Sequence, residues 1–263
     1  MQPNKIVTLT TDFGQAGSYA GAVKGVLLGI NPELRIVDIT HEISPFNILE
    51  GALLLNSFYQ FFPSGTIHLV VVDPGVGGKR KGILVRTDDY FFVGPDNGVF
   101  SFIYDQEKVR GMINLTNSEY FLGKPSSTFH ARDIFAPVSA YLSLGINPEE
   151  FGPPAEECLK LKLPQPVQKK NRLTGEIVYI DNFGNLVTNI EANSIAKARR
   201  IQIRIKNKKL NRLNLFYEQE KKGKLLALIG SSNFLEIAVN QGDAQKLLKA
   251  KTGDKITIAK IKK

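Results

Sequence analysis

Apolar and polar positions in the first half of the chain alternate between strand spacing and helix spacing. Short apolar, β-branched runs predict strands at Ile6–Thr11, Arg35–Thr40, Thr66–Asp73, Gly82–Thr87 and Tyr90–Val93. Apolar residues at helical spacing predict helices at Tyr19–Ile30, Ile48–Phe61 and Ile134–Leu144. Because Thr66–Asp73 is almost wholly apolar, we expect it to be covered on both faces. The alternation is typical of an α/β domain with a mostly parallel central sheet.

The pattern changes after residue 150. Four prolines lie within Gly152–Pro154 and Leu163–Lys170, where periodicity is weak. Beyond them, strands without intervening helices are predicted at Gly175–Ile180, Leu186–Ile190, Arg200–Ile205, Leu225–Ile229, Phe234–Val239 and Lys255–Ile261. This spacing favours a small all-β barrel or sandwich. We therefore expect an α/β domain over residues 1–163, a linker over 164–171 and an all-β domain over 172–263.

Composition restricts the class of protein. The 263 residues are 43% hydrophobic and 22% charged, which disfavours disorder, a fibre or a coiled coil and allows a sizeable core. Cys158 is the only cysteine, so an intrachain disulfide and a multi-cysteine zinc site are excluded. The chain shows no signal-peptide pattern and no apolar run long enough to cross a bilayer. We expect a cytoplasmic protein without a membrane partner or a metal.

The net charge of +9 first suggests nucleic acid or an acidic membrane as a partner. However, residues 1–163 carry 13 basic and 17 acidic side chains, whereas residues 164–263 carry 21 basic and 8 acidic ones. The excess therefore belongs to the second half, where Lys206–Arg212 and Lys221–Lys224 are basic clusters. They have few aromatic neighbours and no RNA-binding motif. We interpret them as a solvated face, so no nucleic-acid partner is expected.

Two aspartates lie at the carboxyl ends of predicted strands, at the edge where open α/β sheets usually bind ligands. Asp12 is suited to accept both hydroxyl protons of a ribose, or else to cap the following helix. Asp73 enters a Pro- and Gly-rich turn that lacks the Gly-Lys-Ser/Thr ending of a phosphate-binding loop. Arg80 follows seven residues later and is placed to pair with Asp73, which would keep the carboxylate ionised. A tight turn with a surface salt bridge is the alternative interpretation.

Of the three histidines, His130 is the best candidate for chemistry. It lies in the polar turn Ser126–Asp133, beside an arginine and an aspartate, where an imidazole is suited to handle a water proton near neutral pH. His41 follows a strand and His68 lies within one, so we interpret both as structural. The strand-end turn Gly94–Gly98 is also interpreted as structural rather than as part of a pocket.

The second half contains a candidate purine site. Phe183 offers a ring for stacking and Asn185 an amide for hydrogen bonds to a base edge, although these residue types are also common in hairpins. Glu236 lies on an apolar strand after a polar turn. It is suited either to bind an ammonium group or to lie on the solvated face, and the sequence slightly favours the solvated face.

These motifs, in this order, resemble the family of adenosine-forming S-adenosylmethionine hydrolases, also called S-adenosylmethionine hydroxide adenosyltransferases, which are related to the fluorinases and chlorinases. The resemblance covers nearly the whole chain and rests on Thr10–Gly14, His41–Ala52, Asp73–Arg80, Gly94–Gly98, Phe129–Pro137, Asp181–Ile190 and Ser231–Gly242. It implies an α/β domain joined to a C-terminal β-barrel. It also implies a homotrimer with active sites between subunits, and cofactor-free hydrolysis of S-adenosyl-L-methionine to adenosine and L-methionine.

The resemblance further implies roles for individual residues. Asp73, Arg80 and His130 would activate the attacking water. The residues implied to contact the substrate are Asp12 and Phe46 at the ribose, Phe183 and Asn185 at the adenine, Asp181, Ser231 and Glu236 at the methionine end, and Val239 through its backbone.

Two other functions are compatible with parts of the sequence. A halogenase-type transferase would use halide in place of water, but the related halogenases lack an aspartate at the position of Asp73, where a carboxylate would repel the anion. A non-catalytic adenosine- or RNA-binding module would depend on the basic second half. The presence of Asp73, Arg80 and His130 together disfavours both. Since S-adenosylmethionine is itself cationic, the acidic first half suits it better than the basic second half.

Overall fold

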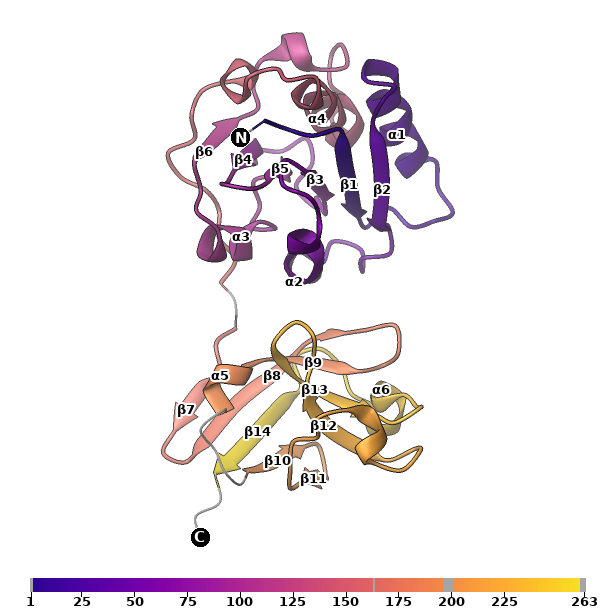
Figure 1. The fold of residues 1–263 in the computed structure, drawn as a ribbon, viewed down its shortest axis with the longest axis vertical. Helices are drawn as coiled ribbons and strands as arrows, with labels where there is room; N and C mark the ends of the chain where they lie inside the picture. The colour runs from indigo at the N-terminus through magenta and orange to yellow at the C-terminus, as the bar shows by residue number, and fades with distance from the viewer. Residues whose placement is uncertain (1, 163, 196–200, 261–263) are drawn as a thin grey trace. The chain divides into compact units, whose positions relative to one another are not determined.

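The computed structural model describes residues 2–162, 164–195 and 201–260. They form two compact units, an N-terminal unit over Met1–Leu161 and a C-terminal unit over Lys162–Lys263 (Figure 1). Arg200, where one strand was expected to begin, and Ile261, where another was expected to end, lie outside the described residues.

The N-terminal unit contains a mixed six-stranded sheet in the order β2-β1-β3-β5-β4-β6. Its strands are β1 (Ile6–Thr11), β2 (Arg35–Thr40), β3 (Ile67–Val71), β4 (Gly82–Arg86), β5 (Phe91–Pro95) and β6 (Gly111–Asn114). The pairs β1–β2, β1–β3 and β3–β5 are parallel, but β4 runs antiparallel to both β5 and β6. The expectation of a mostly parallel sheet therefore needs correction at this edge. The turn between β4 and β5 is too short for a parallel crossover, so the two strands form a hairpin.

Helices cover both faces of this sheet. They are α1 (Tyr19–Ile30), α2 (Ile48–Phe58), α3 (Ser101–Gln106) and α4 (Ala136–Ser143), with 3-10 turns η1 (Tyr59–Phe61), η2 (Ser118–Tyr120) and η4 (Pro148–Phe151). The helix predicted at Ile134–Leu144 is confirmed by α4, and a π-helical turn that was not predicted, η3 (Ala131–Phe135), leads into it. The hydrophobic pattern does not predict α3 or β6, because elements of six and four residues are too short to show a period.

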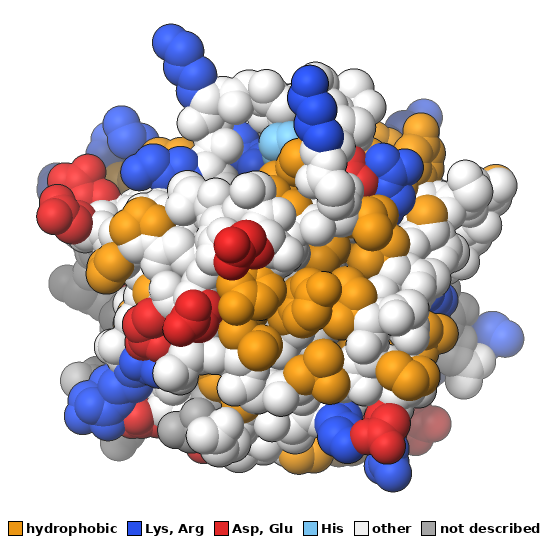
Figure 2. All heavy atoms as spheres, turned by 90° about the horizontal axis from the view of Figure 1, so that it is seen from above, with side chains coloured by type: hydrophobic (Ala, Val, Ile, Leu, Met, Phe, Trp, Pro, Cys, Tyr) orange, Lys and Arg blue, Asp and Glu red, His pale blue; other side chains and the backbone are white. Residues whose placement is uncertain are grey.

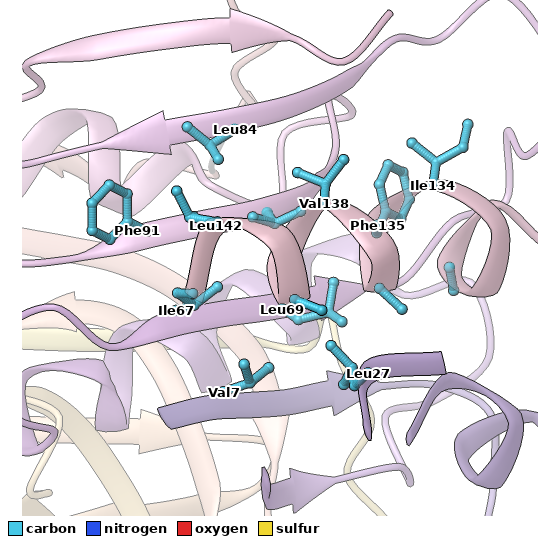
Figure 3. Close-up of a cluster of buried hydrophobic side chains, with 14 of the residues drawn as sticks. Val7, Leu27, Ile67, Leu69, Leu84, Phe91, Ile134, Phe135, Val138 and Leu142 are labelled. Carbon is cyan, nitrogen blue, oxygen red and sulfur yellow. The ribbon is translucent and has the colours of Figure 1, made fainter. Parts of the chain in front are cut away.

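Strand β3 is buried on both faces, as its apolar sequence predicts. On one face, Ile67 and Leu69 pack in a cluster with α1 and α4, and Figure 3 shows Val138 and Leu142 of α4 over these strand residues. On the other face, Val70 packs with residues of α2 and α3. Because both faces are covered, the end of β3 is held rigidly where it delivers Asp73.

The burial of His68 on β3 predicts a loss of stability in acid. Its side chain is 0% exposed, Nδ1 lies 2.9 Å from Oγ1 of Thr8, and Nε2 has no hydrogen-bond partner among the described residues. Burial lowers the pKa of His68 from 6.5 to about 3. As the pH falls below 6.5, this histidine becomes protonated in the unfolded chain but stays neutral in the folded one. The free energy of unfolding therefore decreases as the pH falls from 7 toward the pKa of the folded protein. We expect this histidine to reduce the free energy of unfolding by about 2 kcal/mol between pH 7 and pH 5.

Denaturant unfolding of the wild type and of His68→Asn at several pH values measures this effect. The asparagine keeps a polar group near Thr8 but does not titrate, so its stability should decline less steeply below pH 6.5. Equal pH slopes for the two proteins would contradict the assignment.

The C-terminal unit contains an eight-stranded antiparallel sheet in the order β11-β10-β14-β8-β9-β13-β12, with β7 paired to β8. Its strands are β7 (Val167–Lys169), β8 (Arg172–Ile180), β9 (Leu186–Glu191), β10 (Ile201–Ile205), β11 (Lys208–Leu210), β12 (Leu225–Ile229), β13 (Phe234–Val239) and β14 (Lys255–Lys260). The terminal strands β11 and β12 contact each other, so the sheet is barrel-like and nearly closed around one apolar core.

Two features of this unit differ from expectation. The helices α5 (Ala192–Ile195) and α6 (Ala244–Leu248), with the 3-10 turn η5 (Tyr217–Gln219), interrupt what was expected to be all-β. They are too short to carry a helical period. Strand β7 lies inside the stretch assigned to a linker. It forms because Val167–Lys169 turns back on β8 as a hairpin.

Candidate active site

A pocket of about 350 Å³ lies at the carboxyl ends of β1 and β3 in the N-terminal unit. These strands are parallel neighbours, so their ends meet at one edge of the sheet. The pocket is lined by Asp12, Phe13, Tyr19, Pro45, Phe46, Val71, Asp73, Val76, Thr128, Phe129, His130 and Ala131. Four residues singled out from the sequence, Asp12, Phe46, Asp73 and His130, are therefore brought to one cavity.

Arg80 joins Asp73 to His130 at the edge of this pocket. Its Nε donates to Oδ1 of Asp73 at 2.9 Å, and its Nη2 donates to Oδ2 of the same carboxylate and to Nδ1 of His130, the latter at 2.8 Å. The side chains of Arg80 and Asp73 are 8% and 6% exposed. The pairing expected from their spacing is confirmed, and it is a buried ion pair rather than a surface salt bridge. A bidentate pair of this kind fixes the orientation of both groups.

This arrangement determines the protonation state of His130. A guanidinium only donates hydrogen bonds, so Nδ1 of His130 must accept from Arg80 and the imidazole carries its proton on Nε2. Burial and the charge of Arg80 both lower the pKa of His130. The ring is therefore neutral near pH 7, with Nδ1 occupied and Nε2 a donor.

Glycine allows the turn after Asp73 to pack against the loop that carries His130. Gly77 has a φ of 74°, and a Cβ atom there would lie 2.0 Å from the carbonyl oxygen of Ser127. Only a residue without a side chain fits this approach. Asn97 also stabilises the start of this turn, because its Nδ2 donates to the backbone carbonyl of Val72 at 2.8 Å. The structural interpretation of the Gly94–Gly98 turn is thus confirmed for Asn97, which holds the strand end before Asp73.

The loop before His130 is held by a buried carboxylate. Oδ2 of Asp133 accepts from the backbone N–H of Ser126 at 2.8 Å, and Oδ1 accepts from Nε of Arg132 at 2.6 Å. Burial raises the pKa of Asp133, but these two hydrogen bonds outweigh it and hold the pKa below its usual value. Asp133 therefore stays ionised and fixes the loop. This role of Asp133 was not expected from the sequence, although an acid directly before an apolar predicted helix is a usable signal.

Asp12 and Phe46 are linked directly. The backbone N–H of Phe46 donates to Oδ2 of Asp12 at 2.9 Å, and Phe46 adopts a left-handed φ of 67°. The alternative role of Asp12 as a helix cap is wrong, because the residue at the start of α1 is Ser18. Oδ1 of Asp12 makes no hydrogen bond within the described part of the chain, so it remains available to a ligand.

Three aromatic lining residues were not expected from the sequence. The rings of Phe13, Tyr19 and Phe129 contact one another, with centroids 5.0 to 5.9 Å apart. Phe13 is next to Asp12 and Phe129 is next to His130 in the sequence. Their positions beside candidate site residues were the only signal that the sequence offered for them. Together they give the pocket an apolar wall suited to a ring or to an organic cation.

In the C-terminal unit, Asp181 organises the turn that contains Phe183 and Asn185. Its Oδ1 accepts from the backbone N–H groups of Phe183 and Asn185 at 2.9 and 2.8 Å, and its Oδ2 accepts from Nδ2 of Asn185 at 2.9 Å. Phe183 is 78% exposed. Hence the ring of Phe183 is presented on the surface, while one donor of Asn185 is already used.

Glu236 on β13 is buried, so the interpretation that it lies on the solvated face is wrong. Oη of Tyr217 donates to its Oε1 at 2.8 Å, and the backbone of Gly230 lies against its Oε2. Burial raises the pKa of Glu236, the charge of Asp181 raises it further, and the bond from Tyr217 opposes both. Nearby, Ser231 is exposed in a turn and Val239 is buried.

Among the residues that the structure describes, no group of three or more His, Cys, Asp or Glu side chains is arranged to hold a metal ion. No helix in that part of the chain is long and apolar enough to span a membrane.

Comparisons with known proteins agree over both units. A family model for the SAM hydroxide adenosyltransferase N-terminal domain matches residues 7–152, and one for the C-terminal domain of the same family matches residues 175–257. The chain is 38% identical to the (R)-S-adenosyl-L-methionine hydrolase of Methanocaldococcus jannaschii, over 96% of this chain and 95% of that protein. A fluorinase of an Actinoplanes species is 26% identical over 74% of each chain.

A solved structure gives the same result for the fold. The crystal structure of an uncharacterized conserved protein from Thermotoga maritima matches with a TM-score of 0.89 and 39% sequence identity, covering 97% of this chain and 99% of that chain. Both units therefore match family models, and a relative is 38% identical along almost the whole chain. The chain belongs to the SAM hydroxide adenosyltransferase family.

Proposed function

We propose that this chain hydrolyses (R)-S-adenosyl-L-methionine to adenosine and L-methionine. The observation that carries the proposal is the buried Asp73–Arg80–His130 network at the edge of a pocket. The name of the Methanocaldococcus jannaschii relative gives the substrate and its configuration. The reaction needs only substrate and water, so we propose no cofactor, and we propose a cytoplasmic location.

The chemistry is a displacement at the 5′-carbon of the ribose. A bond forms between the water oxygen and C5′, the C5′–S bond breaks, and its electron pair leaves on sulfur as the neutral thioether of methionine. The water loses one proton. Because the leaving group departs readily, positioning the water in line with C5′ and sulfur supplies much of the rate.

In this proposal Asp73 accepts a hydrogen bond from the water and takes up its proton as the new bond forms. Arg80 holds both carboxylate oxygens by two donors, which leaves their remaining lone pairs for the water. His130 assists as a neutral donor through Nε2, because Nδ1 is already occupied by Arg80. The three residues then act as one network that orients the nucleophile.

Substrate binding is proposed to use both units. Asp12 would bind the ribose hydroxyls through its free Oδ1, with Phe46 against the sugar. From the C-terminal unit, Phe183 and Asn185 would contact the adenine, Asp181, Ser231 and Glu236 the methionine end, and Val239 the ligand through its backbone. What supports these roles is the family resemblance and the polar groups each position presents.

We propose a homotrimer in which each active site combines the N-terminal unit of one subunit with the C-terminal unit of a neighbour. The resemblance and the division of candidate residues between the units support this. Figure 2 shows hydrophobic side chains grouped on one face of the molecule and bordered by charged ones, as expected for a surface that another copy covers. The domain limits 1–163, 164–171 and 172–263, with a closed barrel in the last, are likewise proposed.

The product of the reaction tests the proposed activity. Purified protein incubated with S-adenosyl-L-methionine should release adenosine and methionine in equal amounts. Added chloride or fluoride should leave the nucleoside product unchanged. A 5′-halogenated nucleoside would indicate a halogenase instead, and salt-dependent RNA binding without methionine release would indicate a binding module.

A further inference from the structure

His41, which was interpreted as structural from its place after a strand, contacts Thr11, the residue that precedes Asp12. Its buried imidazole follows the end of β2, and its Nδ1 lies 2.8 Å from Oγ1 of Thr11, the last residue of β1. The register between the two strands shifts just before this point, so that Leu9 pairs with Asp38 but Thr10 pairs with Thr40. Such irregularities redirect the chain near functional sites.

The hydrogen bonds around Thr11 have a definite direction. Its Oγ1 accepts from the backbone N–H of Phe13 at 3.3 Å. On the far side of the ring, Nε2 of His41 lies 3.2 Å from Oδ1 of Asp38, a charge contact whose alignment falls short of a full hydrogen bond. A proton on Nε2 faces this carboxylate favourably, whereas a lone pair there would be repelled by it. In the neutral imidazole with its proton on Nε2, Nδ1 is the acceptor, and Thr11 donates its hydroxyl proton to His41.

The network encloses Asp12 on both sides. Thr11, which precedes Asp12, is bound to the His41 imidazole. Phe13, which follows Asp12, donates its backbone N–H to the Thr11 hydroxyl. The backbone N–H of Gly14 donates to the carbonyl of His41 at 2.6 Å. The chain after His41 then leads to Phe46, whose N–H binds Oδ2 of Asp12. His41 therefore contacts the segment that carries Asp12 and also begins the segment that carries Phe46.

We propose that His41, acting through the hydroxyl of Thr11, is a positioning residue that sets the orientation of the Asp12 carboxylate toward the ribose of the substrate. The inference rests on the proposed function, because it takes the ligand of Asp12 to be a nucleoside. His41 touches no substrate in this scheme. It affects binding of the nucleoside rather than the displacement at C5′, because Asp73, Arg80 and His130 lie on other elements.

A conservative substitution with a matched control tests this role. Thr11→Val removes the hydroxyl that links His41 to the loop. Thr10→Val is the control, because Thr10 is also fully buried on β1 and its Oγ1 has no hydrogen-bond partner among the described residues. Thr11→Ser restores the hydroxyl.

The expected result is a split between binding and turnover. Thr11→Val should raise the Kd for adenosine and the KM for S-adenosylmethionine by about fivefold to tenfold, with kcat within about twofold of the wild type. Thr11→Ser and Thr10→Val should resemble the wild type. An unchanged Kd in Thr11→Val, or an equal rise in Thr10→Val, would overturn the inference.

The tautomer of His41 gives a second test that requires no variant of Thr11. In ¹⁵N spectra of the wild type, which has three histidines, the His41 signals are assigned by their absence in His41→Asn. A protonated Nε2 with an unprotonated Nδ1 supports the scheme, and a protonated Nδ1 overturns it. If the wild type binds adenosine but forms none from S-adenosylmethionine, the proposed function fails. The adenosine Kd values and the tautomer still decide the role of His41.

Discussion

Asp73→Ala and His130→Ala should each still bind adenosine but form it from S-adenosylmethionine at least about 100-fold more slowly than the wild type. Removing Asp73 deletes the group proposed to take the water proton. It also leaves the Arg80 guanidinium buried without its counter-charge. Removing His130 deletes the second partner of Arg80 at 2.8 Å, so the guanidinium and the water lose their fixed positions.

Single-turnover kinetics and calorimetric titration with adenosine separate the two effects. Asp105→Ala is a suitable control, because it removes an exposed carboxylate on α3 that forms an ion pair with Lys160. Full turnover in either active-site variant would contradict the mechanism. Loss of adenosine binding together with turnover in Asp73→Ala would instead make Asp73 a ligand for the nucleoside.

Gly77→Ala should reduce kcat/KM by at least about 100-fold, because it separates two loops that must touch. A Cβ atom at this position would lie 2.0 Å from the carbonyl oxygen of Ser127, well inside van der Waals contact. The turn would have to move away from the loop that carries His130, and Arg80 would lose its contact with that histidine. The left-handed φ of 74° adds a strain of about 1 kcal/mol for any residue with a side chain.

Gly123→Ala separates the clash from the strain. Gly123 also has a left-handed φ, 60°, but among the described residues no atom beyond its own chain neighbours lies within 4 Å of the Cβ position. Both variants should lose a similar small amount of stability from backbone strain, and only Gly77→Ala should lose most of its activity. Thermal unfolding and steady-state kinetics on the two proteins measure this. Similar activity in both would show that the approach of the two loops is not needed for catalysis.

Much of the N-terminal unit could be predicted because its signals are local. The apolar run of β3 indicated a strand buried on both faces, and the residue after such a strand lies at the ligand-binding edge of an α/β sheet. The pairing of Asp73 with Arg80 was predictable because the six residues between them include three glycines and form a turn that brings the two side chains together. The antiparallel direction of β4 was missed because the apolar pattern of a buried strand is the same in either direction. The short gap between β4 and β5 was the available signal, since it leaves no room for a parallel crossover.

The contacts between distant segments could not be predicted in the same way. Arg80 and His130 are 50 residues apart in the chain, and no periodicity relates them. Glu236 was interpreted as solvated because an acid on a strand usually is, whereas Tyr217 supplies a hydrogen bond that allows its burial. The aromatic wall of the pocket was missed for the same reason, because its rings come from the loop after β1, the start of α1 and the loop before η3.

Amino-acid pattern alone therefore places the elements, the aspartates at strand ends and the set of reactive groups, because hydrophobic period and turn chemistry act over a few residues. Which of those groups meet is established only in the packed fold. The protonation state of His130, the close approach at Gly77 and the support of Asp12 by His41 all depend on contacts between loops from different strands. Such contacts form because packing of the strands and helices brings those loops together at one edge of the sheet. No pattern within the loops themselves specifies them.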